Sequence, residues 1–370
     1  MPHGVGTRKL SSAPLSAAFL ASPEFAANPY PHYSRWRAQK SVQKVEGTNA
    51  WLVMDYDNAA FVLKEASSFS SSPNLDVSPS LNGADGADHT AIRRLVQPFF
   101  SADLQLARRE RIATITRNRL ELLRHRDSFD AISDLTAPIA HAIACDWLGL
   151  TEAGGAIIRA KPVRDVIWTD LEGVLEPGGL CARLLDESTI DTRRLAELTA
   201  FFLMAGVETT REFVLLALLT LREQPESIQA AISDPSIVPA MTDELLRLEP
   251  PAHTLFRDAE KDVVLGGEFI PGGSMIWVSL AAANRDPERF AEPHKIVPGR
   301  KGPRHLSFSV GNHFCLGSHL GRIEGETLLA EIMPYASTIL GNFSGPVVHF
   351  VGQYGAPSLR QIGRWELSFQ

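Results

Sequence analysis

Residues 308–317 read FSVGNHFCLG, a stretch in which one cysteine, Cys315, stands among glycines and aromatic residues. The residues that follow have the pattern of a helix, so this cysteine lies just before a helix N-terminus. Backbone N–H groups and the positive end of a helix dipole stabilise a thiolate at such a place. Gly311 and Gly317 are expected to let the backbone approach the sulfur and a flat macrocycle closely, where a Cβ atom would clash. The stretch predicts a thiolate metal ligand, and Phe308 is expected to shield its sulfur from water.

A thiolate is one of the axial ligands that proteins use for haem iron, to which it pushes electron density. The order Phe-x-x-Gly-x-His-x-Cys-x-Gly resembles the ligand loop of the cytochromes P450, and each position of that pattern matches here. Ser309 stands where relatives usually carry glycine, which predicts a slightly different loop conformation. The alternative is a buried cysteine in an ordinary glycine-rich turn, since free cysteine behaves as a small hydrophobe. The resemblance implies the cytochrome P450 fold, mainly α with small β-sheets, with haem b (iron protoporphyrin IX) as cofactor and Cys315 as the axial ligand of its iron.

Composition is consistent with an enzyme of this kind. The 370 residues include 36 Lys and Arg against 43 Asp and Glu, a formal net charge of −7, which gives no electrostatic reason to expect nucleic acid binding. Three cysteines cannot all pair within one chain, and their low number favours a reducing compartment. Residues 1–20 contain no long apolar run, so they predict neither a signal peptide nor a membrane anchor. We expect a cytoplasmic protein with no membrane association and a single P450 domain over residues 1–370.

Hydrophobic periodicity predicts long helices and a few short strands. The expected helices cover residues 28–36, 56–66, 89–100, 104–124, 133–150, 192–223 and 316–335. The expected strands cover residues 51–53, 263–269 and 275–279, and an irregular hairpin is expected over 358–369.

The predicted helix 192–223 contains the motif AGVETT at residues 205–210. A glycine inside a helix costs about 1 kcal/mol relative to alanine, and an acid and a hydroxyl are poor core residues. In the P450 family the small residues, here Ala205, let this helix pass over the haem, and the acid and alcohol that follow relay protons. The resemblance implies that Glu208 connects to bulk proton donors and that Thr209 acts at the oxygen-binding position. The alternative is a helix kink with a capped polar face.

Glu244 and Arg247 form an i,i+3 acid–base pair. Such pairs stabilise helices by only about 0.2–0.5 kcal/mol and are common, so the pair alone is a weak signal. Its position before Cys315 resembles the Glu-x-x-Arg helix of the P450s, and Arg300 matches the arginine that completes a buried triad. The resemblance implies a structural role, in which the triad fixes the loop that presents the thiolate.

Haem carries propionates, so cations are expected around its rim. The resemblance indicates His89 and Arg93, which would share one helix face, together with Arg257 and His313. Charge-assisted hydrogen bonds from such groups orient the macrocycle. For each residue taken alone, a solvated side chain is the alternative.

The substrate pocket is predicted by position in the family. Its expected wall residues are Phe201, Met204, Leu255, Phe256 and Ile362. The segments 69–88 and 151–199, which form the roof in the family, are short here. We expect an open haem mouth and a bulky substrate such as a peptide, a macrocycle or a carrier-tethered intermediate.

Electrons are expected from a separate ferredoxin and ferredoxin reductase, because 370 residues leave no room for a flavin domain beside a P450 domain. A basic face on the thiolate side would steer an acidic ferredoxin, although scattered surface arginines are an equal alternative. The arginines on those segments are Arg93, Arg94, Arg108, Arg109, Arg304 and Arg322.

The sequence thus predicts a haem-thiolate monooxygenase that hydroxylates or epoxidises a bulky substrate of secondary metabolism. Two alternatives stay open: a P450-type enzyme of oxidative C–C or C–O coupling, and a non-catalytic haem-binding accessory protein. Glu208 and Thr209 favour oxygen insertion, because coupling enzymes can dispense with the alcohol.

Overall fold

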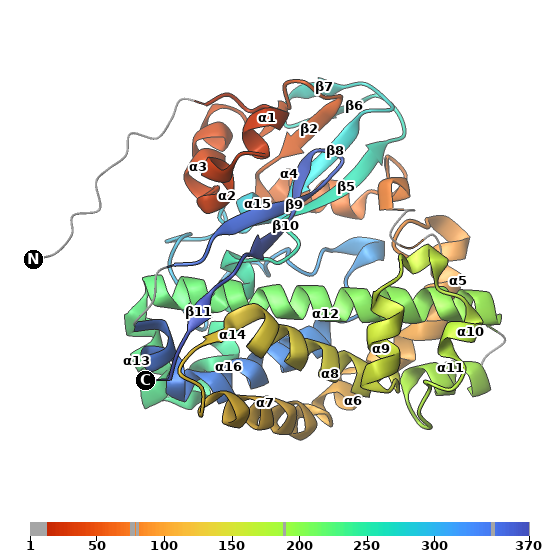
Figure 1. Ribbon diagram of the computed structural model, residues 1–370. Helices are drawn as coiled ribbons and strands as arrows, with labels where there is room; N and C mark the ends of the chain where they lie inside the picture. Colours follow the sequence, from red (N-terminus) through yellow and green to blue (C-terminus); the bar gives the residue numbers. More distant parts are fainter. Residues whose placement is uncertain (1–12, 75–77, 79–80, 188–189, 342–344, 370) are drawn as a thin grey trace, which may run out of the picture.

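The structure is a computed structural model that describes residues 13–74, 78, 81–187, 190–341 and 345–369. A long helix, α12 (Thr192–Glu223), crosses the molecule between the main sheet on one side and a layer of helices on the other (Figure 1). The helix begins where the Asp191 carboxylate accepts a hydrogen bond from the N–H of Arg194. The bounds predicted for this helix from the sequence are confirmed.

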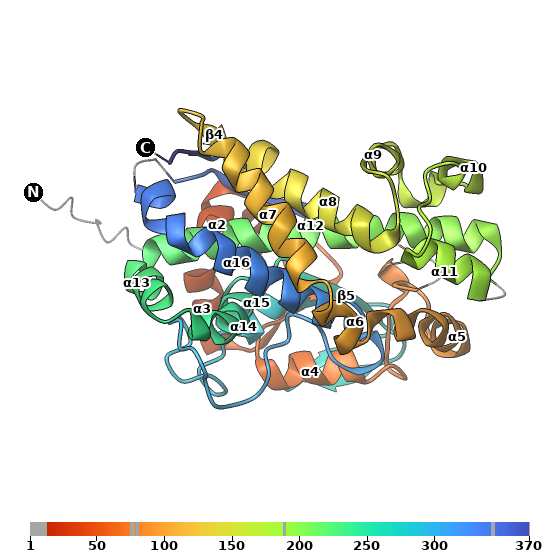
Figure 2. The same ribbon diagram turned by 90° about the horizontal axis from the view of Figure 1, so that it is seen from below.

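Four helices form the layer below α12, and Figure 2 shows how they cross one another. They are α7 (Arg109–Leu123), α8 (Ala137–Leu148), α14 (Val238–Leu248) and α16 (Ser318–Gly341). Helices α8 and α16 both contact α12, and α16 also contacts α7 and α14. The remaining described helices are α1 (Ala17–Leu20), α2 (Pro23–Ala27), α3 (Tyr30–Gln39), α4 (Tyr56–Lys64), α5 (Gly86–Val96), α6 (Ala102–Leu106), α9 (Glu152–Arg159), α10 (Trp168–Leu171), α11 (Leu180–Glu187), α13 (Pro225–Ser233) and α15 (Leu280–Ala283).

The main sheet has the strand order β1-β2-β8-β5-β3. Its strands are β1 (Val42–Lys44), β2 (Ala50–Val53), β3 (Phe69–Ser70), β5 (Thr254–Ala259) and β8 (Met275–Ser279). Strands β2 and β8 run parallel and the other pairs run antiparallel. Smaller antiparallel pairs join β6 (Val263–Leu265) to β7 (Glu268–Ile270), β9 (Val348–Gln353) to β10 (Ala356–Ile362), and β4 (Phe129–Asp130) to β11 (Glu366–Leu367). The expected mainly helical chain with small sheets is confirmed.

Several predicted elements differ from the structure at turns. The helix predicted over 104–124 is two helices, because α6 ends at Leu106 and α7 begins at Arg109. The strand predicted over 263–269 is a tight hairpin, whose turn uses Gly266 and Gly267 with φ of 57° and 81°. The hairpin predicted over 358–369 begins earlier, since β9 already pairs with β10 from Val348. Periodicity locates apolar segments, but it does not locate the turns that divide them.

Two hydrophobic cores meet along α12. One core packs the C-terminal half of α12, including Phe213 to Leu218, against α7, α8, α14 and α16. The other core packs its N-terminal half against α8 and the helices that precede α12. Among the described residues, no helix is long and apolar enough to cross a lipid bilayer. The middle of α12, between the two cores, borders the cavity described next.

Candidate active site

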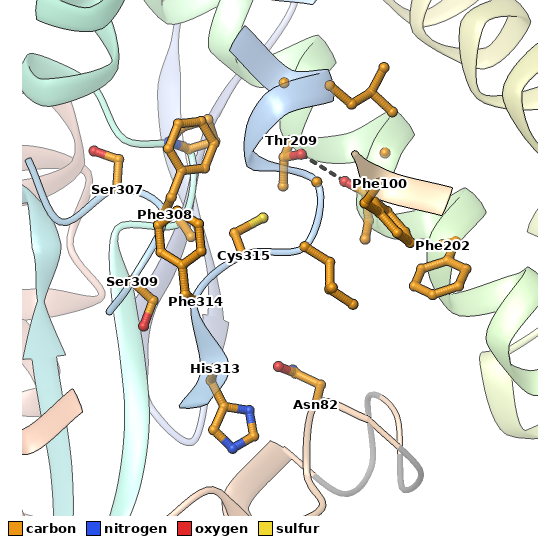
Figure 3. Close-up of a pocket in the computed structure, with 18 of the residues that line it drawn as sticks. Asn82, Phe100, Phe202, Thr209, Ser307, Phe308, Ser309, His313, Phe314 and Cys315 are labelled. Carbon is orange, nitrogen blue, oxygen red and sulfur yellow. Dashed lines mark hydrogen bonds between the residues drawn. The ribbon is translucent and has the colours of Figure 1, made fainter. Parts of the chain in front are cut away.

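Cys315 lies at the end of a loop closed by backbone hydrogen bonds. Its N–H donates to the carbonyl of Phe308 (2.8 Å), and its sulfur accepts the N–H of Gly317 just before α16. The side chain has accessible surface, but that surface faces an internal cavity (Figure 3). Burial raises the pKa of the Cys315 thiol above its ordinary value. The hydrogen bond from the Gly317 N–H and the charges of Arg93 and Arg322 act in the opposite direction and limit the rise. A metal cation at the sulfur would remove this proton.

The loop needs backbone conformations that suit glycine. Gly311 has φ of 76°, and a Cβ there would lie 2.8 Å from the carbonyl oxygen of Leu63. This glycine therefore allows close approach to the end of α4, whereas the sequence predicted an approach to the sulfur. At Gly317 a Cβ would lie 3.8 Å from the Cys315 sulfur, an ordinary contact distance, so the clash predicted with the sulfur is wrong. The close approach expected to a flat macrocycle stays a prediction. Ser309 keeps a positive φ of 59°, a conformation that costs a serine more than a glycine.

The cavity has a volume of about 310 Å³ and lies between the Cys315 loop and the middle of α12. Apolar and aromatic side chains form much of its wall. Those from α12 and its neighbours are Phe100, Trp147, Phe201, Phe202, Ala205, Phe213, Leu246, Leu255, Phe308 and Leu320. Apolar side chains of this kind limit the access of water to the sulfur.

The predicted basic residues meet at this cavity. His89 and Arg93 on α5, Arg257 on β5, and His313 beside the ligand all line it, although they come from segments far apart in the chain. The rings of His89 and His313 stack with centroids 4.2 Å apart. Arg93 donates to the carbonyl of Phe314 (2.6 Å), and this contact ties α5 to the ligand loop.

The ionisation of these basic groups is shaped by burial. Burial lowers the pKa of His89 to about 4, helped by the charges of His313 and Arg93. Burial therefore favours the neutral ring of His89, and a propionate at this position would raise the pKa and favour the predicted cation. Burial also lowers the pKa of Arg257 to about 10, which leaves it charged. His313 pairs with Asp85, whose oxygen lies 3.3 Å from its Nε2.

Helix α12 turns only one side of the AGVETT motif toward the cavity. Ala205, Gly206, Thr209 and Thr210 line the cavity, but Glu208 does not. The hydroxyl of Thr209 donates to the carbonyl of Ala205 (2.7 Å), one turn earlier. Thr209 therefore lies at the cavity as expected, and Glu208 points away from it, because adjacent helix residues point about 100° apart. The role expected for Glu208, a link to bulk proton donors, stays a prediction.

Of the five residues predicted to form the wall of the substrate pocket, some line the cavity and others do not. Phe201 and Leu255 line the cavity as expected. Met204 shares the off-cavity stripe of α12 with Glu208, at i,i+4 spacing, and does not line it. Phe256 alternates to the opposite face of β5, where it is buried against the ring of Tyr354. Ile362 is buried in the core beside α12 rather than in the cavity wall.

The predicted Glu244–Arg247–Arg300 triad is confirmed, with Glu244 and Arg247 buried and Arg300 half-buried. Arg247 makes a bidentate pair with Glu244 (2.7 and 2.9 Å), and Arg300 donates to the same carboxylate (2.9 Å). Arg247 also donates to the carbonyl of Asn284 (2.9 Å). The Asn284 side chain bonds Ser307 and the N–H of Leu306, the residues that lead into the ligand loop. The triad is thereby connected to the segment that presents Cys315.

Two residues at the cavity escaped the sequence analysis. Glu324 on α16 is buried, lines the cavity and accepts a hydrogen bond from Thr210 (2.6 Å). Asn82 borders the cavity near His313 (Figure 3). For Glu324 a signal existed, because a carboxylate stands at an otherwise buried position of a helix that follows the ligand.

The residues at the cavity fit a haem. Cys315 offers a soft anionic ligand inside a largely apolar cavity, and basic or donor side chains gather on one rim. A flat apolar macrocycle with an iron centre and anionic edge groups matches this donor set. Cys315 would hold the iron, and His89, Arg93, Arg257 and His313 would hold the propionates.

Comparison with known proteins points the same way. A family model for cytochrome P450 matches residues 180–337. Cytochrome P450 107B1 of Saccharopolyspora erythraea is 28% identical, over 84% of this chain and 88% of its own length. The 6-deoxyerythronolide B hydroxylase of the same organism is also 28% identical, over 85% of this chain and 90% of its own. The testosterone complex of CYP109E1 from Bacillus megaterium superposes with a TM-score of 0.82 at 23% identity, over 94% of this chain and 99% of that one.

Proposed function

Because this chain belongs to the cytochrome P450 superfamily and is a monooxygenase of that type, we propose that it hydroxylates or epoxidises a bulky natural product. The observation that carries the proposal is the Cys315 sulfur, which faces a largely apolar cavity bordered on its α12 side by the Thr209 hydroxyl. Haem b, when bound, supplies the activation of O2, for which no amino-acid side chain is suited.

The chain's own residues have separate tasks in this reaction. Cys315 binds the iron, and Arg257 and Arg93 orient the cofactor through its anionic edge. The aromatic wall from α12 keeps water out, which limits unproductive loss of reducing equivalents. Thr209 holds a hydroxyl at the cavity where protons are needed.

The short segments expected to form the roof of the cavity support the proposal of a bulky substrate. Residues 151–187 form only short helices, of which α10 spans Trp168–Leu171, and this agrees with the short roof that the sequence predicts. One relative is a hydroxylase of 6-deoxyerythronolide B, and another structure holds testosterone. We propose a substrate of this size class, in free or carrier-tethered form.

Electrons would come from a ferredoxin and its reductase. Three arginines of the predicted basic face, Arg108, Arg109 and Arg322, are already paired with acids within the chain. The attraction for an acidic partner would therefore rest more on Arg94, which is exposed. The cytoplasmic location stays a prediction.

The test joins a spectrum to product analysis. The reduced, CO-bound protein should show the Soret band of thiolate-ligated haem, and Cys315→Ser should lose it. Cys181→Ser is the matched control, because Cys181 is buried against Thr199 and does not line the cavity. With a ferredoxin system and 18O2, a hydroxylated product should carry one 18O atom.

Oxidative coupling is the second candidate, because it needs the same thiolate-ligated haem but less proton delivery, and the proton path through Glu208 stays a prediction. A dehydrogenative product without 18O would establish coupling and overturn oxygen insertion. A band typical of histidine or neutral-thiol ligation would overturn the thiolate assignment.

A further inference from the structure

Arg322 on α16 lies against Phe308, the residue expected to shield the Cys315 sulfur. The guanidinium carbon of Arg322 is 4.5 Å from the centroid of the Phe308 ring, in a cation–π arrangement. Phe308 lines the cavity beside Cys315 (Figure 3), and its carbonyl accepts the Cys315 N–H at 2.8 Å. Arg322 does not line the cavity. The Phe308 ring therefore contacts both the cavity and a cation that lies outside the cavity wall.

Helix α16 packs directly on the Phe308 ring. Gly321 precedes Arg322 on this helix, and a Cβ at Gly321 would already lie 3.5 Å from the ring. Arg322 also donates from Nη1 to the carbonyl of Ser318, one turn earlier, at 3.4 Å. The guanidinium is thus brought to the ligand loop by the backbone of a helix that touches that loop.

Asp243 on α14 holds Arg322 in this place. The Nε of Arg322 donates to Oδ1 of Asp243 at 3.0 Å, and Nε2 of His305 lies 3.5 Å from the same oxygen. The N–H of Ser307 donates to Nδ1 of His305 at 3.2 Å, so the ring proton sits on Nε2 and faces the aspartate. Asp243 therefore links Arg322 to the segment that leads into the ligand loop.

The two charges differ in their exposure to water. The contact with His305 and the pair with Arg322 outweigh burial and lower the pKa of Asp243 to about 2, so Asp243 is an anion at neutral pH. Its side chain is 55% exposed, whereas that of Arg322 is 27% exposed. Water screens the anion more than the cation. Arg322 is also one of two cations whose charges lower the pKa of the Cys315 thiol, so its field reaches the sulfur.

We propose that Arg322, held against Phe308 by Asp243, tunes the electron density on the Cys315 thiolate and so sets how readily the bound haem iron is reduced. The proposal rests on Cys315 as the iron ligand in the function proposed above, and it is independent of the substrate. A cation near the sulfur withdraws electron density from it and stabilises the electron that the iron gains. That electron comes from the redox partner, and iron(III) becomes iron(II) with no bond broken. Arg322 is a positioning residue, because it acts through Phe308 and through its field.

The first test is a redox titration of the haem-loaded protein against a reference dye. Arg322→Gln should lower the reduction potential, with the equilibrium constant for reduction falling about threefold or more, because a stabilising charge is lost. Asp243→Asn should raise the potential, because the amide oxygen can still accept the Arg322 N–H while the negative charge is gone. A general loosening of the loop would move both variants in the same direction. Shifts of the same sign, or an unchanged potential in Arg322→Gln, would overturn the proposal.

Two more variants separate this charge from others on the surface. Arg109→Gln is the matched control, since Arg109 is also an arginine paired with an acid of α16, Glu326, at 2.6 Å. Its potential should equal that of the wild type, and a shift as large as that of Arg322→Gln would overturn the assignment to Arg322. Arg322→Lys keeps the charge and should recover part of the wild-type potential. A value as low as that of Arg322→Gln would overturn the electrostatic explanation.

The second test is the infrared C–O stretching frequency of the reduced, CO-bound protein. Arg322→Gln should lower this frequency, because a stronger thiolate donor pushes more electron density through the iron into CO. Asp243→Asn should raise it. Neither variant should lose the thiolate Soret band, and loss of that band in Arg322→Gln would show that Arg322 holds the ligand in place and does not tune it.

These measurements need neither substrate nor turnover, so they separate this proposal from the proposed function. A wild type without the thiolate band would overturn the ligand assignment on which both rest. A wild type that has the band but forms no 18O product would overturn oxygen insertion alone, and the predicted shifts would still hold. Unchanged frequencies in both variants, beside an intact band, would overturn the role of Arg322 alone.

Discussion

Some residues at the cavity can be recognised from the motif around them in the sequence. For others, the direction in which the side chain points from its helix decides whether it reaches the cavity. Cys315, His313 and Arg93 were expected at the cofactor and do line the cavity. Met204 was expected in the cavity wall too, yet it points elsewhere from α12. A difference of one position along α12 decides whether a side chain reaches the reaction space.

Thr209 provides the prediction at this scale. Thr209→Ala should retain the haem and its thiolate spectrum but lower the product formed per NADH by about tenfold or more, because the cavity loses a hydroxyl. Product and H2O2 are measured together in a reconstituted ferredoxin system.

Thr220→Ala is the matched control for this variant. Thr220 lies on the same helix and donates to the carbonyl one turn earlier (Leu216, 3.0 Å), as Thr209 does, but it does not line the cavity. Its yield should equal that of the wild type. Equal yields for Thr209→Ala and Thr220→Ala would remove Thr209 from the proton path.

Two close contacts between elements, each made at a glycine, position the ligand loop and the helix that follows it. The ligand loop rests on the end of α4 at Gly311, and α16 rests on α12 at Gly325. Sequence analysis marked Gly311 as important but for a different contact, because the neighbour lies far away in the chain. It did not mark Gly325, whose need arises only when α12 packs against α16.

The loop crossing gives a stability prediction. Gly311→Ala should lower the free energy of unfolding by about 2–4 kcal/mol, since it combines backbone strain with a clash against Leu63. Gly273→Ala should cost only about 1 kcal/mol, because Gly273 has a similar φ of 80° but open space around it. Urea unfolding of both variants checks this, and equal losses would contradict the role assigned to the α4 contact.

The triad gives a prediction for pH. Burial raises the pKa of Glu244, but the hydrogen bonds and charge of Arg247, with Val297 N–H and Arg300, outweigh burial and lower it below its ordinary value of 4.5. A carboxyl with a lowered folded-state pKa stabilises the protein above its ordinary pKa, and this stability is lost as pH falls through the folded-state pKa. The stability difference between wild type and Glu244→Gln should therefore be largest at neutral pH and shrink below about pH 4.5.

Glu121→Gln is the control for the triad, since Glu121 forms an i,i+3 pair with Arg124 on the exposed surface. Its effect should stay within about 0.5 kcal/mol at each pH. Unfolding by urea at a series of pH values measures both variants. A pH-independent difference for Glu244→Gln would show that the carboxylate is not what stabilises the triad.

At the scale of the whole molecule, segments from both ends of the chain meet in one buried charged cluster. The carboxylate of Glu249, just after α14, accepts hydrogen bonds from Tyr30 on α3, Arg285 after α15 (3.2 Å) and Arg360 on β10 (2.6 Å). The guanidinium of Arg285 also stacks over the ring of Tyr30, 3.5 Å from its centroid. We propose that such contacts make the chain one domain, as the sequence predicted.

This cluster gives the fourth prediction. Glu249→Gln should lower the free energy of unfolding by about 3–5 kcal/mol, because two buried guanidinium groups lose their counter-charge. Glu268→Gln, which removes the partner of the exposed Lys40, should cost less than about 1 kcal/mol. Chemical unfolding compares the two, and similar small losses would mean that water already solvates the cluster.

The sequence by itself determined the ligand loop, the long helix α12 and the Glu-x-x-Arg helix, because each is a local pattern whose spacing carries its own physical reason. The resemblance to the P450s that these patterns carry also located the basic residues expected at the anionic groups of the cofactor. The tertiary structure decided which acid faces the cavity, which strand residues line it and where apolar segments turn. Those features depend on the phase of a helix or strand relative to its packing partner, and that phase is set by contacts such as the α12–α16 crossing, which joins residues distant in sequence.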